Sequence, residues 1–363
     1  MLALLLILVF GTATSRHGPA AGLLALALVA LDPNFVAHAG VVHTDVAAAV
    51  AFLASVLAWE SARRRPTPLR LLGAALVLGL SLATKFSAIL LLPILLVQSL
   101  LAARREPRPG RAAVAAALRL GTVAAVALLV VLAVYAPLTS RMDSEYQRRV
   151  IHEMVALRGA PRLSAAIESL AGVSRPLAHY FGGLASVLRQ SEIGGGVNYL
   201  AGKASVHGFP SYFFVAFALK STLAFLAVTV LAVVTFLRRP KEFGEEGRLF
   251  LLPAAILFLA SIGSAYNIGI RHMLPAYPFL ALAGAAAFAR AARRHDGRGP
   301  ARGALVLSLL PILSGYELLR IHPHELSYFN AIAGGPERGG RILSDSNVDW
   351  GLDLKRLASE LSR

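Results

Sequence analysis

Long apolar stretches, separated by short polar or basic segments, follow one another along almost the whole chain. A helix needs about 20 apolar residues to cross the hydrocarbon core of a bilayer. This rule predicts about ten membrane-spanning helices, at residues 1–15, 18–34, 44–61, 70–84, 86–103, 113–137, 212–237, 249–266, 273–291 and 303–321. Lys85 interrupts an apolar stretch that is too long for one crossing, which predicts a helical hairpin with Lys85 near its turn. The expected fold class is therefore an all-α polytopic membrane protein.

Composition agrees with this pattern. Of the 363 residues, 56% are hydrophobic and 15% are charged, and the mean hydropathy of +0.63 lies outside the range of soluble globular domains. The net charge is +16, but the arginines form short runs between apolar stretches and do not line one polar face. Such runs are typical of anchors beside a membrane, so we expect membrane lipid and no nucleic acid as a partner. The absence of cysteine excludes disulfides and thiolate chemistry.

The basic loops predict an orientation, because Lys and Arg are in excess in cytoplasmic loops. The richest loops are 63–70, 104–111, 238–248 and 290–302, and alternation of the predicted helices places all four on one side. The outer side then receives the segments 35–43, 138–211, 267–272 and 322–363. We expect the chemistry of the protein on this outer side.

The domain organisation is expected to be simple. Residues 1–321 form a transmembrane helical domain, and residues 322–363 form a C-terminal outer segment. The long loop 138–211 mixes charged residues with glycines and predicts short helices at the outer membrane surface. The sequence shows no internal repeat, and we do not divide the chain into separately folding domains.

Four ionisable residues gather at one predicted outer boundary, Asp32, His38, His43 and Asp45. Ionisable groups at such positions are costly to desolvate and usually pair, line a polar cavity or serve function. We select Asp45 as the candidate catalytic residue. The alternative is that Asp32 and Asp45 only cap helices. His43 and Asp45, with His38, are also candidate ligands of a divalent metal ion, although their spacing matches no strong metal motif.

Three cationic or imidazole side chains are candidates for binding a phosphate. Lys85 lies between apolar helices without an acidic neighbour in the sequence, and Arg271 and His272 occupy a short turn with few other charges nearby. An ammonium binds phosphate as a point charge, and a guanidinium matches it bidentately. The alternatives are a lysine that extends to the interface and an interfacial anchor at residues 271–272.

The stretch from His322 to Asp353 is the densest run of polar and aromatic residues. Carboxylates that bind hydroxyls and an aromatic face that stacks on a pyranose ring are typical of a sugar site, and the candidates here are Asp345, Asp349, Trp350 and Asp353. A small outer helix with aspartate caps fits the same composition.

Four stretches together resemble a known family, and they occur in the expected order along nearly the whole chain. They are ALDPNFVAHAGVVHTDVAAA, LSLATKFSAILLLP, the pair GGGVNYLAGKASVHGFPSYFFVAFALKST and IGIRHMLPAYPFLAL, and YFNAIAGGPERGGRILSDSNVDWGLDLKRL. These stretches are similar to bacterial lipid-carrier-dependent glycosyltransferases of the GT-C superfamily, related to protein O-mannosyltransferases and aminoarabinose transferases. The SDSN and DWG elements are the most distinctive part of the likeness.

The resemblance implies a hexosyl- or mannosyltransferase-like membrane enzyme of the bacterial inner membrane. It would take a sugar from a polyprenyl-phosphate carrier at the outer face and pass it, with inversion, to an acceptor that is a protein, a lipid or a glycan. The acceptor hydroxyl needs a general base, and the departing phosphate needs a cation or a divalent metal ion. Asp45 matches an acidic residue of the second outer loop. Lys85 and Arg271 then belong to the phosphate side, and Asp345, Asp349 and Trp350 to the sugar or acceptor side.

Family members begin with one more span and a long first outer loop that carries the usual catalytic base. This chain starts within what resembles their second span. The resemblance leaves three interpretations: the N-terminus is truncated, the start is a misassigned Met, or the chain is a degenerate relative that lacks the base. Two other functions stay open from the sequence. A transporter or flippase for a lipid-linked or small polar solute would be favoured by broken helices with charges at membrane depth. A catalytically inactive binding or scaffold subunit would bind polyprenyl phosphate without turnover.

Overall fold

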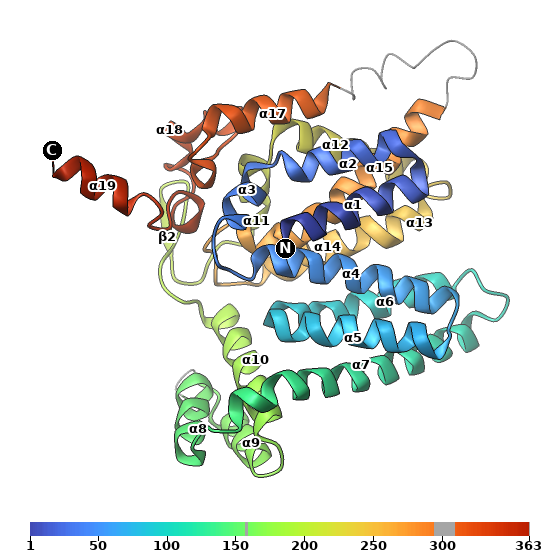
Figure 1. Cartoon of the computed structure of the whole chain (residues 1–363), viewed down its shortest axis with the longest axis vertical. Helices are drawn as coiled ribbons and strands as arrows, with labels where there is room; N and C mark the ends of the chain where they lie inside the picture. Colours follow the sequence, from blue (N-terminus) through green and yellow to red (C-terminus); the bar gives the residue numbers. More distant parts are fainter. Residues whose placement is uncertain (157–158, 294–308, 363) are drawn as a thin grey trace. The chain divides into compact units, whose positions relative to one another are not determined.

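The computed structural model describes residues 1–156, 159–293 and 309–362. Contacts between Cα positions divide the chain into two compact units, Met1–Ala49 with Gly196–Arg363 and Val50–Gly195. Both units are built almost entirely of helices, as the all-α prediction requires (Figure 1).

The first unit contains most of the helices. They are α1 (Leu2–His17), α2 (Pro19–Ala30), α3 (Pro33–Ala39), α11 (Tyr212–Lys220), α12 (Leu223–Arg238), α13 (Gly244–Glu246), α14 (Leu252–Ile262), α15 (Tyr277–Arg293), α17 (Leu310–Ile321), α18 (Pro336–Gly339) and α19 (Leu354–Leu361). Shorter 3-10 and π turns join them, η3 (Gly247–Leu251), η4 (Ile270–Ala276), η5 (Glu325–Ser327), η6 (Ala331–Ala333) and η7 (Asp345–Asn347).

Helix α15 is the central helix of the first unit. It packs against α1, α2 and α12. In the helical stretch Ile270–Ala292, which η4 and α15 form together, 94% of the most apolar segment is buried inside the protein. Its small residues allow this close packing: a Cβ atom at Gly284 would lie 1.9 Å from Cγ1 of Val228 on α12. Glycine at this position therefore sets how closely the two helices approach.

The second unit contains a long helix with two shorter apolar helices packed on it. Its elements are α4 (Asp45–Arg64, whose first turn belongs to the first unit), α5 (Pro68–Thr84), η1 (Phe86–Leu90), α6 (Leu91–Ala103), α7 (Pro109–Thr139), α8 (Ser144–Ile151), η2 (His152–Ala156), α9 (Pro161–Ala171) and α10 (Arg175–Ile193). Helix α7 packs against α5, α6 and α10. Only 22% of its most apolar window is buried, as expected for a helix that faces lipid.

The structure supports an integral membrane protein but does not confirm ten spans. Four described helical stretches are long and apolar enough to cross a membrane: Asp45–Arg64, Phe86–Ala103, Pro109–Thr139 and Ile270–Ala292. The pair α2 and α3, bent by 61°, makes a fifth if it counts as one broken span. At the other predicted spans, the helices are shorter than the 18 residues required of a candidate span. These helices are α1, α5, α12, α14 and α17. Part of the predicted helix 303–321 lies outside the described residues.

The predicted break at Lys85 is present. Helix α5 ends at Thr84, and Lys85 adopts an extended conformation before η1 begins. The loop 138–211 carries the expected short helices, α8, α9 and α10, which share a small core that includes Ile151 and Ala178. Near its C-terminal end, the loop 138–211 also contains two strands that the all-α prediction missed. They are the antiparallel pair β1 (Asn198–Leu200) and β2 (Lys203–Ser205). Ala201 and Gly202 form its turn with positive φ, which matches the twist of a tight hairpin.

Candidate functional site

The candidate catalytic residue Asp45 lies in the first turn of α4 and is fully buried. His43, in the preceding loop, places Nδ1 2.8 Å from Oδ2 of Asp45. A neutral imidazole donates from one ring nitrogen and accepts at the other. The tautomer with a proton on Nδ1 leaves Nε2 as an acceptor. The close contact between Nδ1 and Oδ2 of Asp45 is an ion-pair distance and does not have the geometry of a hydrogen bond. The carboxylate also lies in the first turn of α4, where the helix dipole favours negative charge.

Arg271 completes this group from a distant part of the sequence. Its Nη1 lies 3.2 Å from Nε2 of His43 and 3.7 Å from Oδ2 of Asp45. The guanidinium carbon also lies 4.5 Å from the centre of the Trp350 ring, and the ring of His43 lies 5.1 Å from the same indole. The four residues, named here the Asp45 cluster, join a carboxylate, an imidazole, a guanidinium and an aromatic face. Each was a candidate from the sequence.

The SDSN element, residues 344–347, fixes the position of Arg271 relative to Trp350. Ser346 donates a hydrogen bond from Oγ to the carbonyl of Ile268, and the amide oxygen of Asn347 accepts from the backbone N–H of Ile270. Between these contacts, Gly269 has φ of +155°, and a Cβ atom there would lie 2.4 Å from Oγ of Ser346. The turn before Arg271 is therefore hydrogen-bonded directly to the segment that precedes Trp350.

Lys220, at the end of α11, is a buried cation that the sequence reasoning missed. Its ammonium donates to the carbonyls of Leu326 (2.7 Å) and Asn347 (2.6 Å) and lies 4.5 Å from the ring centre of Phe329. Nearby, Nδ2 of Asn34 donates to the carbonyl of Lys220. The end of α11 thus connects α3 with the C-terminal segment. The sequence feature that could have identified Lys220 is its position as a single lysine at the end of an aromatic and apolar run, YFFVAFALK.

The predicted sugar-side aspartates separate into different environments. Asp349 accepts from the backbone N–H groups of Trp350 and Gly351, and Asp353 pairs with His324 and Arg356, each at 3.3 Å. Asp345 bonds the N–H of the next residue and has φ of +59°. Local turn contacts and ion pairs thus account for part of what these carboxylates do. Asp353 directly precedes α19, but its side chain makes no cap hydrogen bond to that helix.

A cavity of about 290 Å³ lies beside α3, between that helix and the C-terminal segment. Its lining includes Gly40 and Val41 on one side and Asp349, Asp353 and His324 on the other. Asp345 and Trp350, both described by the structure, do not line it. Two of the four predicted sugar-side residues therefore share a polar cavity.

The remaining candidates lie elsewhere. His272 contacts the rings of Phe213 and Tyr266, with ring centres 6.2 and 6.0 Å away. Lys85 is half-buried in the second unit, whereas the Asp45 cluster belongs to the first. Asp32 is the N-cap of α3 and accepts from the N–H of Asn34, so the capping interpretation is confirmed for Asp32.

The arrangement of the cluster does not fit a resident divalent ion. Within the described residues, no group of three or more His, Asp or Glu side chains converges on one point. His43 and Asp45 supply two ligands, and the guanidinium of Arg271 occupies the space that both of them face. A fixed cation there disfavours a second one by charge repulsion.

One family model matches part of the chain. Residues 1–136 match the family model described as dolichyl-phosphate-mannose-protein mannosyltransferase. No curated protein and no solved structure gives a significant match. The matched region contains His43, Asp45 and Lys85, whereas Arg271 and Trp350 lie beyond it.

The family match confirms the relation to the GT-C superfamily that the sequence motifs indicated. Together with the apolar helices, the match suggests a membrane glycosyltransferase of the GT-C type.

Proposed function

We propose that this chain transfers a hexose from a polyprenyl-phosphate carrier to an acceptor hydroxyl, with inversion at the anomeric carbon. The acceptor hydroxyl belongs to a protein, a lipid or a glycan. One observation carries the proposal: Arg271 contacts the carboxylate of Asp45 and the ring of Trp350 at the same time. A base, a cation for phosphate and an aromatic surface for a sugar therefore lie in one cluster.

The proposed reaction is a single displacement. The acceptor oxygen attacks the anomeric carbon and loses its proton to the carboxylate of Asp45. The bond between that carbon and the phosphate oxygen breaks, and polyprenyl phosphate leaves with the electron pair. Arg271 stabilises the phosphate charge through its planar set of N–H donors. In this proposal the phosphate replaces Asp45 as the partner of Arg271, which frees the carboxylate for the acceptor.

Supporting residues follow from the same geometry. His43 lies against the carboxylate of Asp45, with Nδ1 2.8 Å from Oδ2, and limits where that carboxylate can lie. Trp350 offers the stacking face, and the cavity lined by Asp349 and Asp353 is the proposed place for sugar or acceptor hydroxyls. Lys85 and His272 stay proposed as secondary partners of the carrier phosphate, by charge alone.

We propose that the cluster faces outward across the bacterial inner membrane. The candidate span Ile270–Ala292 starts beside the cluster and ends near Arg290. About 20 helical residues separate two membrane boundaries, so Arg271 and Arg290 belong to opposite sides. The basic loops 238–248 and 290–302 mark the second side as cytoplasmic by their charge.

The test is a donor-consumption assay. Purified protein in lipid nanodiscs is given radiolabelled polyprenyl-phosphate hexose with a hydroxyl acceptor, and released polyprenyl phosphate and the glycosylated product are measured. Stoichiometric appearance of both supports transfer. Binding of the donor without release of polyprenyl phosphate would instead identify a scaffold or binding subunit.

One structural observation favours a second candidate, a transporter or flippase. The helix pair α2 and α3 is bent by 61°, and Asp32 lies at the break. Broken helices with an ionisable residue at the break are typical of transport sites. Uptake of a labelled solute into proteoliposomes, without any glycosyl transfer, would place this function first.

A further inference from the structure

A basic pocket lies at the far end of α15, away from the Asp45 cluster. It encloses about 230 Å³, and α12, α15 and the loop after α12 line it. Its basic lining residues are Arg238, Arg239 and Arg290, and its acidic lining residue is Glu242. Ligand pockets for drug-sized molecules usually measure about 300–1,000 Å³. This pocket is smaller and suits a compact charged group.

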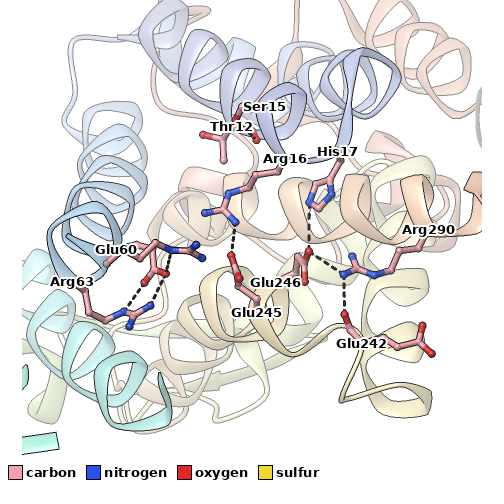
Figure 2. Close-up of polar contacts among 11 residues, drawn as sticks. Thr12, Ser15, Arg16, His17, Glu60, Arg63, Glu242, Glu245, Glu246 and Arg290 are labelled. Atoms are coloured by element: carbon pink, nitrogen blue, oxygen red, sulfur yellow. Dashed lines mark hydrogen bonds and ion pairs between the residues drawn. The ribbon is translucent and has the colours of Figure 1, made fainter. Parts of the chain in front are cut away.

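The arginines of the pocket have positive charge and N–H groups with which to bind an anion. Arg290 donates from Nη2 to the carbonyl of Glu242 and to Oε1 of Glu246, at 2.8 and 3.0 Å (Figure 2). Its guanidinium carbon also lies 4.9 Å from the ring centre of Phe243. Arg239 forms an exposed ion pair with Glu242 at 3.5 Å, which contributes little in water. A guanidinium has five N–H donors, so these contacts use only part of the capacity of either residue.

An exposed apolar stripe on α12 leads to the same pocket. Val230, Val233, Val234 and Leu237 are exposed and follow the i, i+3, i+4, i+7 spacing of one helix face. Val234 also lines the pocket. An exposed apolar stripe on a membrane protein meets acyl chains, so the pocket connects a lipid-facing surface to three arginines at the membrane boundary.

We infer that this pocket binds the headgroup of an anionic phospholipid, whose acyl chains lie along the stripe on α12. The phosphate would be held by Arg238, Arg239 and Arg290. Basic pockets between membrane helices bind anionic headgroups through the same charge complementarity. The continuity of pocket and apolar stripe favours a lipid over a free phosphate. This inference does not depend on the proposed transfer reaction.

The test uses native mass spectrometry of the purified full chain with phosphatidylglycerol or phosphatidylcholine. We expect phosphatidylglycerol to bind preferentially. The double variant Arg238→Gln/Arg239→Gln should weaken that binding about 30-fold, equivalent to about 2 kcal/mol, since each arginine near an anionic surface contributes about 1 kcal/mol. Both side chains are exposed, so the variant is expected to fold. The charge-preserving variant Arg238→Lys/Arg239→Lys should keep most of the binding.

The matched control is Arg148→Gln/Arg149→Gln, which removes the same charge from exposed positions on α8. Phosphatidylglycerol binding should be unchanged in this control. Equal binding of the two lipids, or undiminished phosphatidylglycerol binding by the Arg238→Gln/Arg239→Gln variant, would overturn the inference. Displacement of the lipid by inorganic phosphate at the same concentration would overturn it too, because the pocket would then bind free phosphate.

Discussion

Arg271 lies with its guanidinium carbon 4.5 Å from the centre of the Trp350 ring, while its Nη1 lies 3.7 Å from Oδ2 of Asp45. A cation over an aromatic face contributes about 2 kcal/mol when the pair is desolvated. Arg271 is buried and Trp350 is half-buried, so the contact is partly shielded from water. The Asp45 cluster therefore depends on docking of the C-terminal segment, which brings Trp350 to Arg271.

The first prediction concerns the carboxylate. Asp45→Asn preserves the shape of the side chain but removes the base, and we expect turnover of polyprenyl-phosphate hexose to fall about 10²–10⁴-fold. The turnover rate is measured as the release of polyprenyl phosphate at saturating substrate concentration.

Asp143→Asn is the matched control for Asp45→Asn. The Asp143 carboxylate caps α8 by accepting from the N–H groups of Tyr146 and Glu145, which hold the pKa of the carboxyl below its ordinary value. Asparagine caps a helix about as well as aspartate, so turnover should be unchanged in this control. Unchanged turnover in Asp45→Asn would remove Asp45 from the mechanism.

The second prediction concerns the aromatic surface. Trp350→Ala removes the ring beneath Arg271, and kcat/KM for the donor should fall about 30-fold, the equivalent of about 2 kcal/mol. Trp350→Phe keeps an aromatic face and should lose less. Steady-state kinetics with varied donor concentration measure both variants, and equal losses would contradict a role for the ring face.

The third prediction concerns the buried lysine. Lys220→Met leaves the carbonyls of Leu326 and Asn347 without this donor, and each unsatisfied buried group costs about 1–3 kcal/mol. We expect a lower thermal unfolding midpoint in detergent and faster proteolysis after residue 322. Lys203→Met, at an exposed position in β2, is the control and should behave like the unmodified protein. The same proteolysis rate in both variants would show that Lys220 does not anchor the segment.

The fourth prediction uses two helical glycines. A Cβ atom at Gly284 would lie 1.9 Å from Val228, so Gly284→Ala should destabilise the protein by about 1–3 kcal/mol through overpacking. Gly121 in α7 is exposed with open space around it, and Gly121→Ala should be neutral or stabilising by about 0.5–1 kcal/mol. Reversible unfolding in mixed micelles compares the two. A larger loss at Gly121 would refute this account of the contact between α12 and α15.

The length of the apolar stretches was enough to predict several membrane-spanning helices. The predicted helices at 44–61, 86–103, 113–137 and 273–291 correspond to the four candidate spans, because hydrophobic length directly limits which helices can cross a bilayer. The remaining predicted spans are not confirmed, because the described helices there are short. At α14, for example, the apolar stretch divides between a π turn and an 11-residue helix.

By itself, the sequence determined the helical class, the break at Lys85, the family relation and the residue types of the Asp45 cluster, because these depend on local composition and short motifs. Only the tertiary structure decided which candidates meet. It joined His43, Asp45, Arg271 and Trp350, placed His272 against aromatic rings, and revealed Lys220 as the anchor of the C-terminal segment. The physical reason is that these contacts join segments far apart in the chain, and their geometry follows from helix packing and buried hydrogen bonds.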